Sequence, residues 1–139
     1  MVNRDIIISK MAQIQDSLDR LKQRQKVSLL EFTDERDIQD IVLFNMQIAI
    51  QGCVDIASHI ISYHNWGVIP SLAGMFEVLH EKKVISEKTH QAMVSMAGFR
   101  NLIVHEYVKL DMKRVHQFLT MHLDDIPTFL KEIAAYIKL

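Results

Sequence analysis

The 139-residue sequence has few of the residues that break secondary structure or cross-link a chain. It contains 4 glycines, 2 prolines and a single cysteine, Cys53, and aromatic residues make up only 7% of it. So few turn formers argue against a β-sandwich or barrel and favour a helical bundle. One cysteine excludes an internal disulfide and indicates a reducing compartment. We therefore expect one helical domain over residues 1–139, with a core of its own.

An excess of one charge and long apolar runs are also lacking. The formal net charge of -1 argues against strong, unspecific binding to nucleic acid or anionic lipid, although it leaves room for a local basic pocket. No apolar run approaches the length needed to cross a bilayer. The first residues, MVNRDIIISKMAQ, carry Asp5 and an apolar run of only three residues, unlike a signal peptide. We expect a cytoplasmic protein without a membrane partner.

Apolar residues recur at spacings of three and four along most of the chain, which is typical of amphipathic helices. This pattern predicts an all-α fold, an antiparallel bundle of about five helices. The helices are expected at residues 4–25, 35–63 and 72–79, from 86 into the stretch 99–110, and from 111 to 137.

Several residues suit the expected helix boundaries. Ser86 and Asp111 are good N-caps for the last two helices, and Thr33 or Asp34 is a plausible N-cap for the helix over 35–63. Pro127 falls inside the last helix and is expected to kink or interrupt it.

The helix expected over 35–63 is apolar over most of its circumference. Its polar stripe is thin and consists of Asp40, Gln47, Gln51, Asp55 and Ser62. A helix that is apolar on most sides is either the central helix of a bundle or an interface helix.

Polar residues concentrate in the stretch FRNLIVHEYVKL, residues 99–110. On an ideal helix Arg100 and His105 are separated by about 140° and do not share a face. Asn101 lies about 40° from His105, where it can hydrogen-bond the imidazole and fix its tautomer. Arg100 and Tyr107 share the neighbouring face. Either the long arginine side chain reaches His105, or the helix changes geometry near His105, or a second subunit completes the site.

Each of these residues taken singly has an ordinary explanation. A histidine near a helix end is commonly a cap, an arginine half of a surface ion pair, and a tyrosine a packed aromatic. Other signatures are lacking: the sequence has no Gly-rich phosphate loop and no HExxH, and none of its 7 histidines forms an i, i+4 pair. We therefore expect no metal site and no cofactor.

The joint spacing in RNLIVHEY, arginine, four residues, histidine, any residue, tyrosine, resembles the signature of HEPN-domain ribonucleases. It is most similar to the HepT toxins encoded beside a minimal nucleotidyltransferase (MNT) antitoxin. The resemblance covers roughly residues 35–135 and includes NMQIAIQGCVDIASHII, GVIPSLAGMFEVLHEKKVIS, MAGFRNLIVHEYVKLD and FLTMHLDDIPTFLKEI. Pro127 is a local departure that affects the straightness of the last helix and not the site.

The resemblance implies a ribonuclease that needs no metal and uses the ribose 2′-OH as its internal nucleophile. Arg100 would stabilise the charge on the phosphate, and His105 would transfer the proton. Asn101 would orient His105 or contact phosphate. The need for a 2′-OH would restrict cleavage to RNA.

The resemblance also implies two protein partners. One is a cognate MNT nucleotidyltransferase, which would transfer AMP to Tyr107 and so block the site. The other is a second copy of the chain, because similar proteins form homodimers with two motif helices around a shared cleft. The apolar helix over 35–63 is a candidate for that contact.

Two further groups of residues have both a functional and an ordinary interpretation. Asp55 and His59, four apart, are candidates to line the cleft, but an ordinary pair on one helix face is the preferred explanation. Lys109, Lys113 and Arg114 are candidates to contact the RNA backbone, and a solvated helix start explains them equally well.

Two rival functions stay open for the whole chain. One is a non-catalytic helical module that binds a nucleotidyltransferase and helps it to hold its substrate, and the other is a plain structural dimer. The joint presence of Arg100, His105 and Tyr107 favours the ribonuclease, because a binding module has no use for the histidine.

Overall fold

The computed structural model describes residues 2–139, and in this part of the chain all regular structure is helical. The predicted all-α class is confirmed, although the count of about five helices is too low. The described part contains seven α-helices and one 3-10 turn: α1 (Arg4–Lys22), α2 (Leu29–Asp34), α3 (Arg36–His64), α4 (Leu72–Glu81), α5 (Glu87–His105), η1 (Tyr107–Lys109), α6 (Met112–Met121) and α7 (Asp125–Tyr136).

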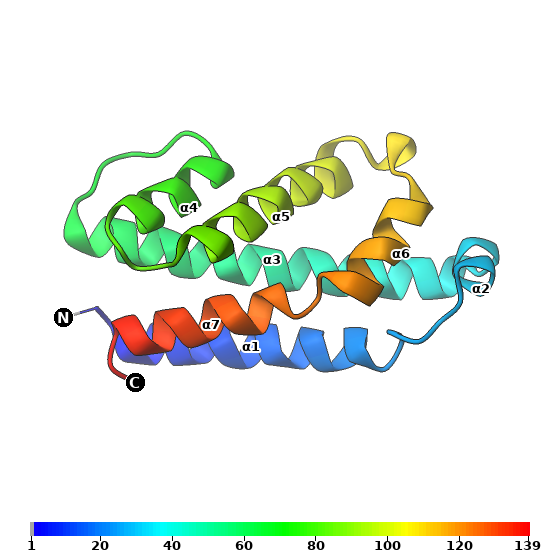
Figure 1. Cartoon of the computed structure of the whole chain (residues 1–139), viewed down its shortest axis with the longest axis horizontal. Coiled ribbons are helices and arrows are strands. Elements are labelled where there is room, and N and C mark those ends of the chain that lie inside the picture. Colours follow the sequence, from blue (N-terminus) through cyan, green and yellow to red (C-terminus); the bar gives the residue numbers. More distant parts are fainter. Residues whose placement is uncertain (1) are drawn as a thin grey trace.

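Helix α3 is the central element of the bundle and contacts each of the other α-helices. Figure 1 shows α1 and α7 along one side of it and α4 and α5 along the other. Both termini lie at one end of the molecule, whereas the connection from α5 to α6 lies toward the other end. The sequence motif is therefore remote from the chain ends.

The length and composition of α3 alone would let it cross a membrane, but 61% of the apolar window that meets this test is buried inside the bundle. The central position of α3 accounts for its apolar surface, which is one of the two explanations drawn from the sequence pattern.

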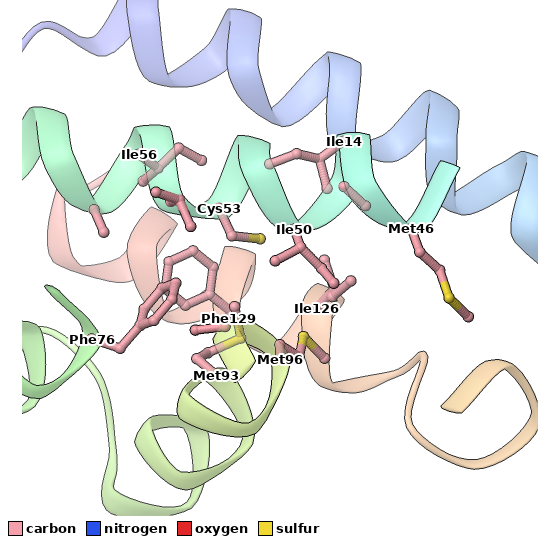
Figure 2. Packing of buried hydrophobic residues seen from close by; sticks show 14 of the residues in the cluster. Ile14, Met46, Ile50, Cys53, Ile56, Phe76, Met93, Met96, Ile126 and Phe129 are labelled. Carbon is pink, nitrogen blue, oxygen red and sulfur yellow. The ribbon is translucent and has the colours of Figure 1, made fainter. Parts of the chain in front are cut away.

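The core lies between α3 and the helices on its two sides (Figure 2). Phe76 of α4 and Phe129 of α7 meet edge to face, with ring centroids 5.6 Å apart. Helices α1 and α3 approach closely at Gly52, because a Cβ atom there would overlap the Ile14 side chain. Cys53 is fully buried in the same core, and burial raises the pKa of its thiol, so it is no candidate nucleophile.

The predictions that Ser86 and Asp111 are N-caps are confirmed, at the starts of α5 and α6. The Ser86 side chain accepts a hydrogen bond from the backbone N–H of Thr89, and the Asp111 side chain accepts one from that of Lys113. The prediction that Thr33 or Asp34 caps the helix over 35–63 is wrong, because both residues belong to α2, a short helix that the sequence pattern did not indicate.

The predicted last helix is two helices, α6 and α7, separated at residues 122–124. The interruption was expected at Pro127, but Pro127 lies in the first turn of α7. The first N–H groups of a helix have no partner inside it, so proline is tolerated there. The proline follows the break and lies in the first turn of the next helix.

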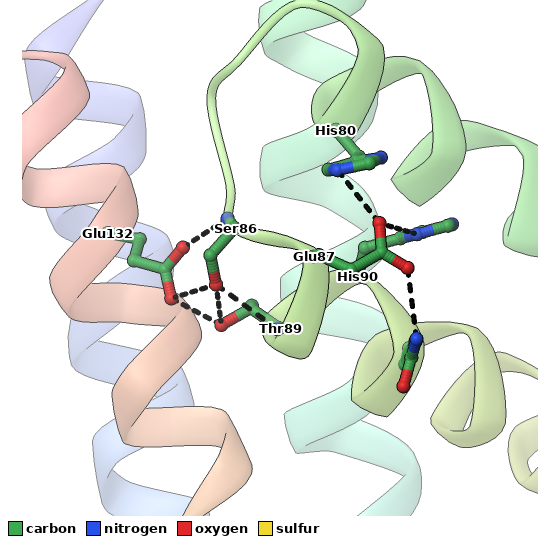
Figure 3. Close-up of polar contacts among 7 residues, drawn as sticks. His80, Ser86, Glu87, Thr89, His90 and Glu132 are labelled. Carbon is green, nitrogen blue, oxygen red and sulfur yellow. Dashed lines mark hydrogen bonds and ion pairs between the residues drawn. The ribbon is translucent and has the colours of Figure 1, made fainter.

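A polar cluster fixes the start of α5 against α7 (Figure 3). The backbone N–H of Ser86 donates to Oε1 of Glu132 at 2.5 Å, and the buried hydroxyl of Thr89 donates to Oε2 of the same carboxylate. This anchor positions the helix whose far end carries Arg100 and His105.

Candidate functional site

The backbone changes conformation directly after His105, the last residue of α5. Glu106 has φ -134° and ψ 40°, and residues 107–109 form the turn η1. Of the three alternatives drawn from the motif spacing, the change of helix geometry near His105 is present. The expectation that Tyr107 shares a helix face with Arg100 is wrong, because the helix ends two residues before the tyrosine.

The Arg100 side chain is directed at α3. Its Nη2 atom donates a hydrogen bond to Oε1 of Gln51 at 2.9 Å. Gln51 Nε2 in turn donates to Oδ1 of Asp55 at 2.9 Å, and Lys10 Nζ of α1 donates to Oδ2 of Asp55 at 3.1 Å. Three helices thus orient one guanidinium, whose Nε atom is buried and has no hydrogen-bond partner within residues 2–139. A planar guanidinium with unused donors is suited to binding an anion such as phosphate.

An ordinary pair on one helix face was the preferred explanation for Asp55 and His59, but no hydrogen bond or ion pair joins their side chains in the described residues. The two oxygens of Asp55 accept from Gln51 and Lys10. His59, one turn further along α3, is half-buried, and its Nε2 atom is buried and unpartnered in the described residues. Asp55 is therefore linked to Arg100 through Gln51, whereas no hydrogen bond connects His59 to this network.

His105 and Asn101 lie together in a shallow pocket of about 290 Å³, with Gly98, Leu102 and Glu106 as its other lining residues. Both side chains are exposed, and no hydrogen bond joins them within residues 2–139. Arg100 does not line this pocket. In one chain, therefore, the arginine and the histidine face different surroundings.

Tyr107 is accessible from solvent. Its side chain is 44% exposed, and its hydroxyl donates to Oδ1 of Asp40, near the start of α3, at 3.3 Å. A single exposed carboxylate holds the phenol, which leaves the hydroxyl open to a second protein.

The basic residues after the motif are exposed, which agrees both with contact to the RNA backbone and with a solvated helix start. Lys109 lies in η1, and Lys113 and Arg114 lie in the first turn of α6. Arg114 and Lys88 line a groove of about 670 Å³ between α5 and the α6–α7 segment. Phe99 and Phe118 line the same groove and stack with ring centroids 5.0 Å apart.

A face of α3 is left uncovered beside the motif. By helical periodicity, Asp40, Phe44, Gln51 and Asp55 share one side of α3, and Phe44 is 64% exposed. Val104 and Val108 of the motif are exposed as well, Val108 to 98%. Exposed apolar side chains grouped around candidate site residues are typical of a protein interface.

The family model for HepT-like ribonucleases matches residues 14–133. The chain belongs to the HepT-like ribonuclease family. It is 31% identical over 131 residues to the mRNA nuclease HepT of Shewanella oneidensis, a match that covers 94% of this chain and 98% of the relative. It is 26% identical over 132 residues to the tRNA nuclease HepT of Aphanizomenon flos-aquae, with 95% and 90% of the two chains covered.

The fold agrees with solved members of this family. The tri-AMPylated Shewanella oneidensis HEPN toxin in complex with its MNT antitoxin superimposes with a TM-score of 0.86 at 31% identity, over 94% of this chain and 98% of that one. The resemblance identified from RNLIVHEY is thereby confirmed at the level of family and fold, and the HepT-like chain is a ribonuclease.

Three residues of the HepT-like site were not predicted as such: Gln51, Lys10 and Asp40. Gln51 and Asp40 belong to the thin polar stripe of α3, which was a signal that could have found them. Lys10 carries no such signal, because its place beside Asp55 depends on how α1 packs on α3.

Proposed function

We propose that this HepT-like ribonuclease is the toxin of a toxin–antitoxin pair and that an MNT-type nucleotidyltransferase is its antitoxin. Similarity along nearly the whole chain to the Shewanella toxin, which was solved with its MNT antitoxin, supports this. Arg100, His105 and Tyr107 are all present at the motif positions. We further propose that the protein acts in the cytoplasm, without a cofactor and without a membrane partner.

The proposed reaction is transfer of a phosphoryl group within the RNA itself. The ribose 2′-oxygen attacks the adjacent phosphorus, and the bond from phosphorus to the 5′-oxygen breaks. The products are a 2′,3′-cyclic phosphate and a 5′-hydroxyl, so no water is consumed, and the reaction is proposed to need no metal ion. The proton lost by the 2′-oxygen and the proton gained by the 5′-oxygen both need a carrier, and the imidazole of His105 can accept and donate a proton.

Arg100 is proposed to stabilise the negative charge that builds up on the phosphate oxygens. Its anchor on Gln51 uses one donor of Nη2 and leaves the donors of Nη1 for the phosphate. A guanidinium oriented before the substrate arrives loses little entropy on binding, which favours the transition state. Through Gln51, Asp55 contributes to this orientation, and His59 lies one turn away on the same helix.

We infer that a second copy of the chain completes the site. The observation that carries this inference is the separation of Arg100, which points at α3, from His105, which lines the pocket with Asn101. A homodimer across the uncovered face of α3 would bury Phe44 and bring two motifs together. It would place the arginine of one copy near the histidine of the other.

The remaining motif residues have supporting roles in the proposal. Asn101 would orient the imidazole of His105 or contact phosphate. Three basic residues, Lys109, Lys113 and Arg114, would contact the RNA backbone next to the scissile phosphate. Such contacts add affinity but do not discriminate between base sequences.

Tyr107 is proposed as the residue at which the antitoxin switches the enzyme off. The phenolic oxygen would attack the α-phosphorus of ATP, pyrophosphate would leave, and the phenolic proton would be lost, with Asp40 as its nearest acceptor. The attached AMP adds negative charge and a bulky nucleoside to the motif, so RNA is excluded.

The proposal is tested by incubating unmodified protein with RNA in the presence of EDTA. Wild type and the control His122→Ala, which removes an exposed histidine outside the motif, are expected to cleave. Arg100→Ala and His105→Ala are expected to lose about 100-fold or more in rate. An otherwise identical DNA strand should resist cleavage.

A mixture of the two inactive variants tests the shared site. If each site uses one residue from each copy, then a mixed dimer contains one intact site, and mixing Arg100→Ala with His105→Ala restores part of the activity. Equal cleavage by all variants, or none by wild type, would contradict a ribonuclease centred on this motif and favour a non-catalytic module that binds a nucleotidyltransferase.

A further inference from the structure

Three side chains outside the ribonuclease site meet where α4 ends and α5 begins. His80 lies in the last turn of α4, Glu87 in the first turn of α5, and His90 one turn further on (Figure 3). Each offers one ligand atom, and these atoms all lie within 4.8 Å of one another.

One carboxylate oxygen is shared by the two histidines. Oε2 of Glu87 lies 2.9 Å from Nε2 of His80 and 3.8 Å from Nδ1 of His90. The other oxygen, Oε1, accepts a hydrogen bond from Gln91 Nε2 at 2.9 Å, which fixes the carboxylate group. Support of this kind from a neighbouring side chain is typical of carboxylates that bind metal ions.

His90 lacks partners that its burial calls for. Both of its ring nitrogens are buried, and neither forms a hydrogen bond in the part of the chain that the structure describes. The ring of His80 stacks parallel to it, with an interplanar angle of 5° and centroids 4.8 Å apart, and provides no hydrogen bond. Buried polar atoms without a partner are costly, so the arrangement indicates a ligand at His90.

The set of donors selects the ligand. Two imidazole nitrogens and one carboxylate oxygen match the preference of Zn²⁺ and similar transition-metal ions, whereas Mg²⁺ and Ca²⁺ prefer oxygen alone. Ligand atoms around a tetrahedral Zn²⁺ lie about 3.3 Å apart, given bonds of about 2.0 Å. Glu87 and His80 are partly exposed, so small rotations of their side chains close the remaining gap.

We propose that His80, Glu87 and His90 bind one Zn²⁺-type cation, which links the end of α4 to the start of α5. The ion would not take part in RNA cleavage, because ten residues of helix separate His90 from Arg100, which is about 15 Å at 1.5 Å per residue. The proposal therefore stands independently of the ribonuclease mechanism. The sequence analysis expected no metal site because no two histidines lie four residues apart on one helix. The present triad comes from two helices, α4 and α5, and that test does not detect it.

The test uses full-length, untagged protein that has been treated with EDTA and dialysed. Titration with CoCl₂ is expected to give visible absorption bands that saturate at one ion per chain and disappear when ZnCl₂ is added. Zn²⁺ should raise the Tm by several degrees, and Mg²⁺ should not.

Two variants remove single ligands, and a third serves as the matched control. His90→Ala and Glu87→Gln are expected to lower the Co²⁺ affinity at least about tenfold. His122→Ala removes an exposed histidine that lies 3.7 Å from the carboxylate of Asp125 but has no third ligand among residues 2–139, and it should bind Co²⁺ like the wild type. Circular dichroism checks that each variant is folded.

An ordinary ion pair between Glu87 and the two histidines predicts a different result. In that case the wild type binds no Co²⁺ at one equivalent, or all variants bind it equally, and either outcome overturns the proposal. RNA cleavage in EDTA, measured in parallel on His90→Ala, keeps the two proposals distinguishable, since loss of the cation site should leave cleavage intact.

Discussion

Arg100 of α5 donates a hydrogen bond from Nη2 to the side-chain oxygen of Gln51 on α3, 2.9 Å away. Gln51 is held in turn by Asp55, and Asp55 by Lys10 of α1. The cation of the motif is therefore oriented by a polar chain that crosses three helices, and residues outside the motif should influence what Arg100 does.

Replacing Gln51 tests this influence. Gln51→Ala removes the acceptor that holds Nη2, so we expect RNA cleavage to fall about fivefold in kcat/KM while the fold is kept, in line with about 1 kcal/mol for an orienting hydrogen bond. Gln47→Ala is the matched control, because Gln47 lies one turn earlier in the same polar stripe of α3 and forms no hydrogen bond with Arg100. It should cleave like wild type. Equal rates for all three proteins would show that Arg100 needs no positioning by α3.

Tyr107 should be the residue modified by the nucleotidyltransferase. Intact mass after incubation with the antitoxin and ATP is expected to show added AMP in wild type and none in Tyr107→Phe, while unmodified Tyr107→Phe keeps cleavage within severalfold of wild type. Tyr63→Phe is the control, because Tyr63 is 43% exposed and Tyr107 is 44% exposed. AMP on the Tyr107→Phe protein would assign the modification to another residue.

Features that depend on residues close together in the sequence, such as helix N-caps, could be predicted from the sequence. Ser86 and Asp111 cap their helices because their side chains reach N–H groups only two or three residues ahead. The six residues of α2 are too few to show a helical period, so the sequence pattern missed that helix. Pro127 was expected to disrupt a helix, but proline is equally compatible with a first turn.

The site was harder to predict because its contacts join distant parts of the chain. Arg100 and Gln51 are 49 residues apart, and Tyr107 and Asp40 are 67 apart. The polar stripe of α3 marked Gln51 and Asp40 as unusual on an apolar helix, but only the packing of α5 and η1 beside α3 shows which motif residue each one meets.

Glu87 should give the protein a small dependence of stability on pH. The hydrogen bond from Gln91, and then the nearby His80 and His90, lower the pKa of this carboxyl below its ordinary value of 4.5. A lowered pKa in the folded state stabilises the fold above the unfolded pKa, and this contribution is lost as the pH falls through the folded pKa. Thermal melts in EDTA should therefore show a slightly lower Tm for Glu87→Gln than for wild type at pH 6, and this difference should shrink as the pH falls below 4.5. A difference that persists unchanged at low pH would mean that charge on Glu87 is not its source.

Two glycines should respond to alanine in opposite directions. In Gly52→Ala the new Cβ overlaps Cγ1 of Ile14 and lies 2.8 Å from its Cδ1, so α1 has to shift on α3, at a cost of about 1–3 kcal/mol. Gly98 of α5 has open space where a Cβ would lie, so Gly98→Ala should stabilise the protein by up to about 1 kcal/mol through helix propensity alone. Urea denaturation of both variants measures the difference, and Gly52→Val should extend the loss. A gain of stability in Gly52→Ala would show that Ile14 repacks freely and that close contact at Gly52 does not determine how α1 sits on the central helix.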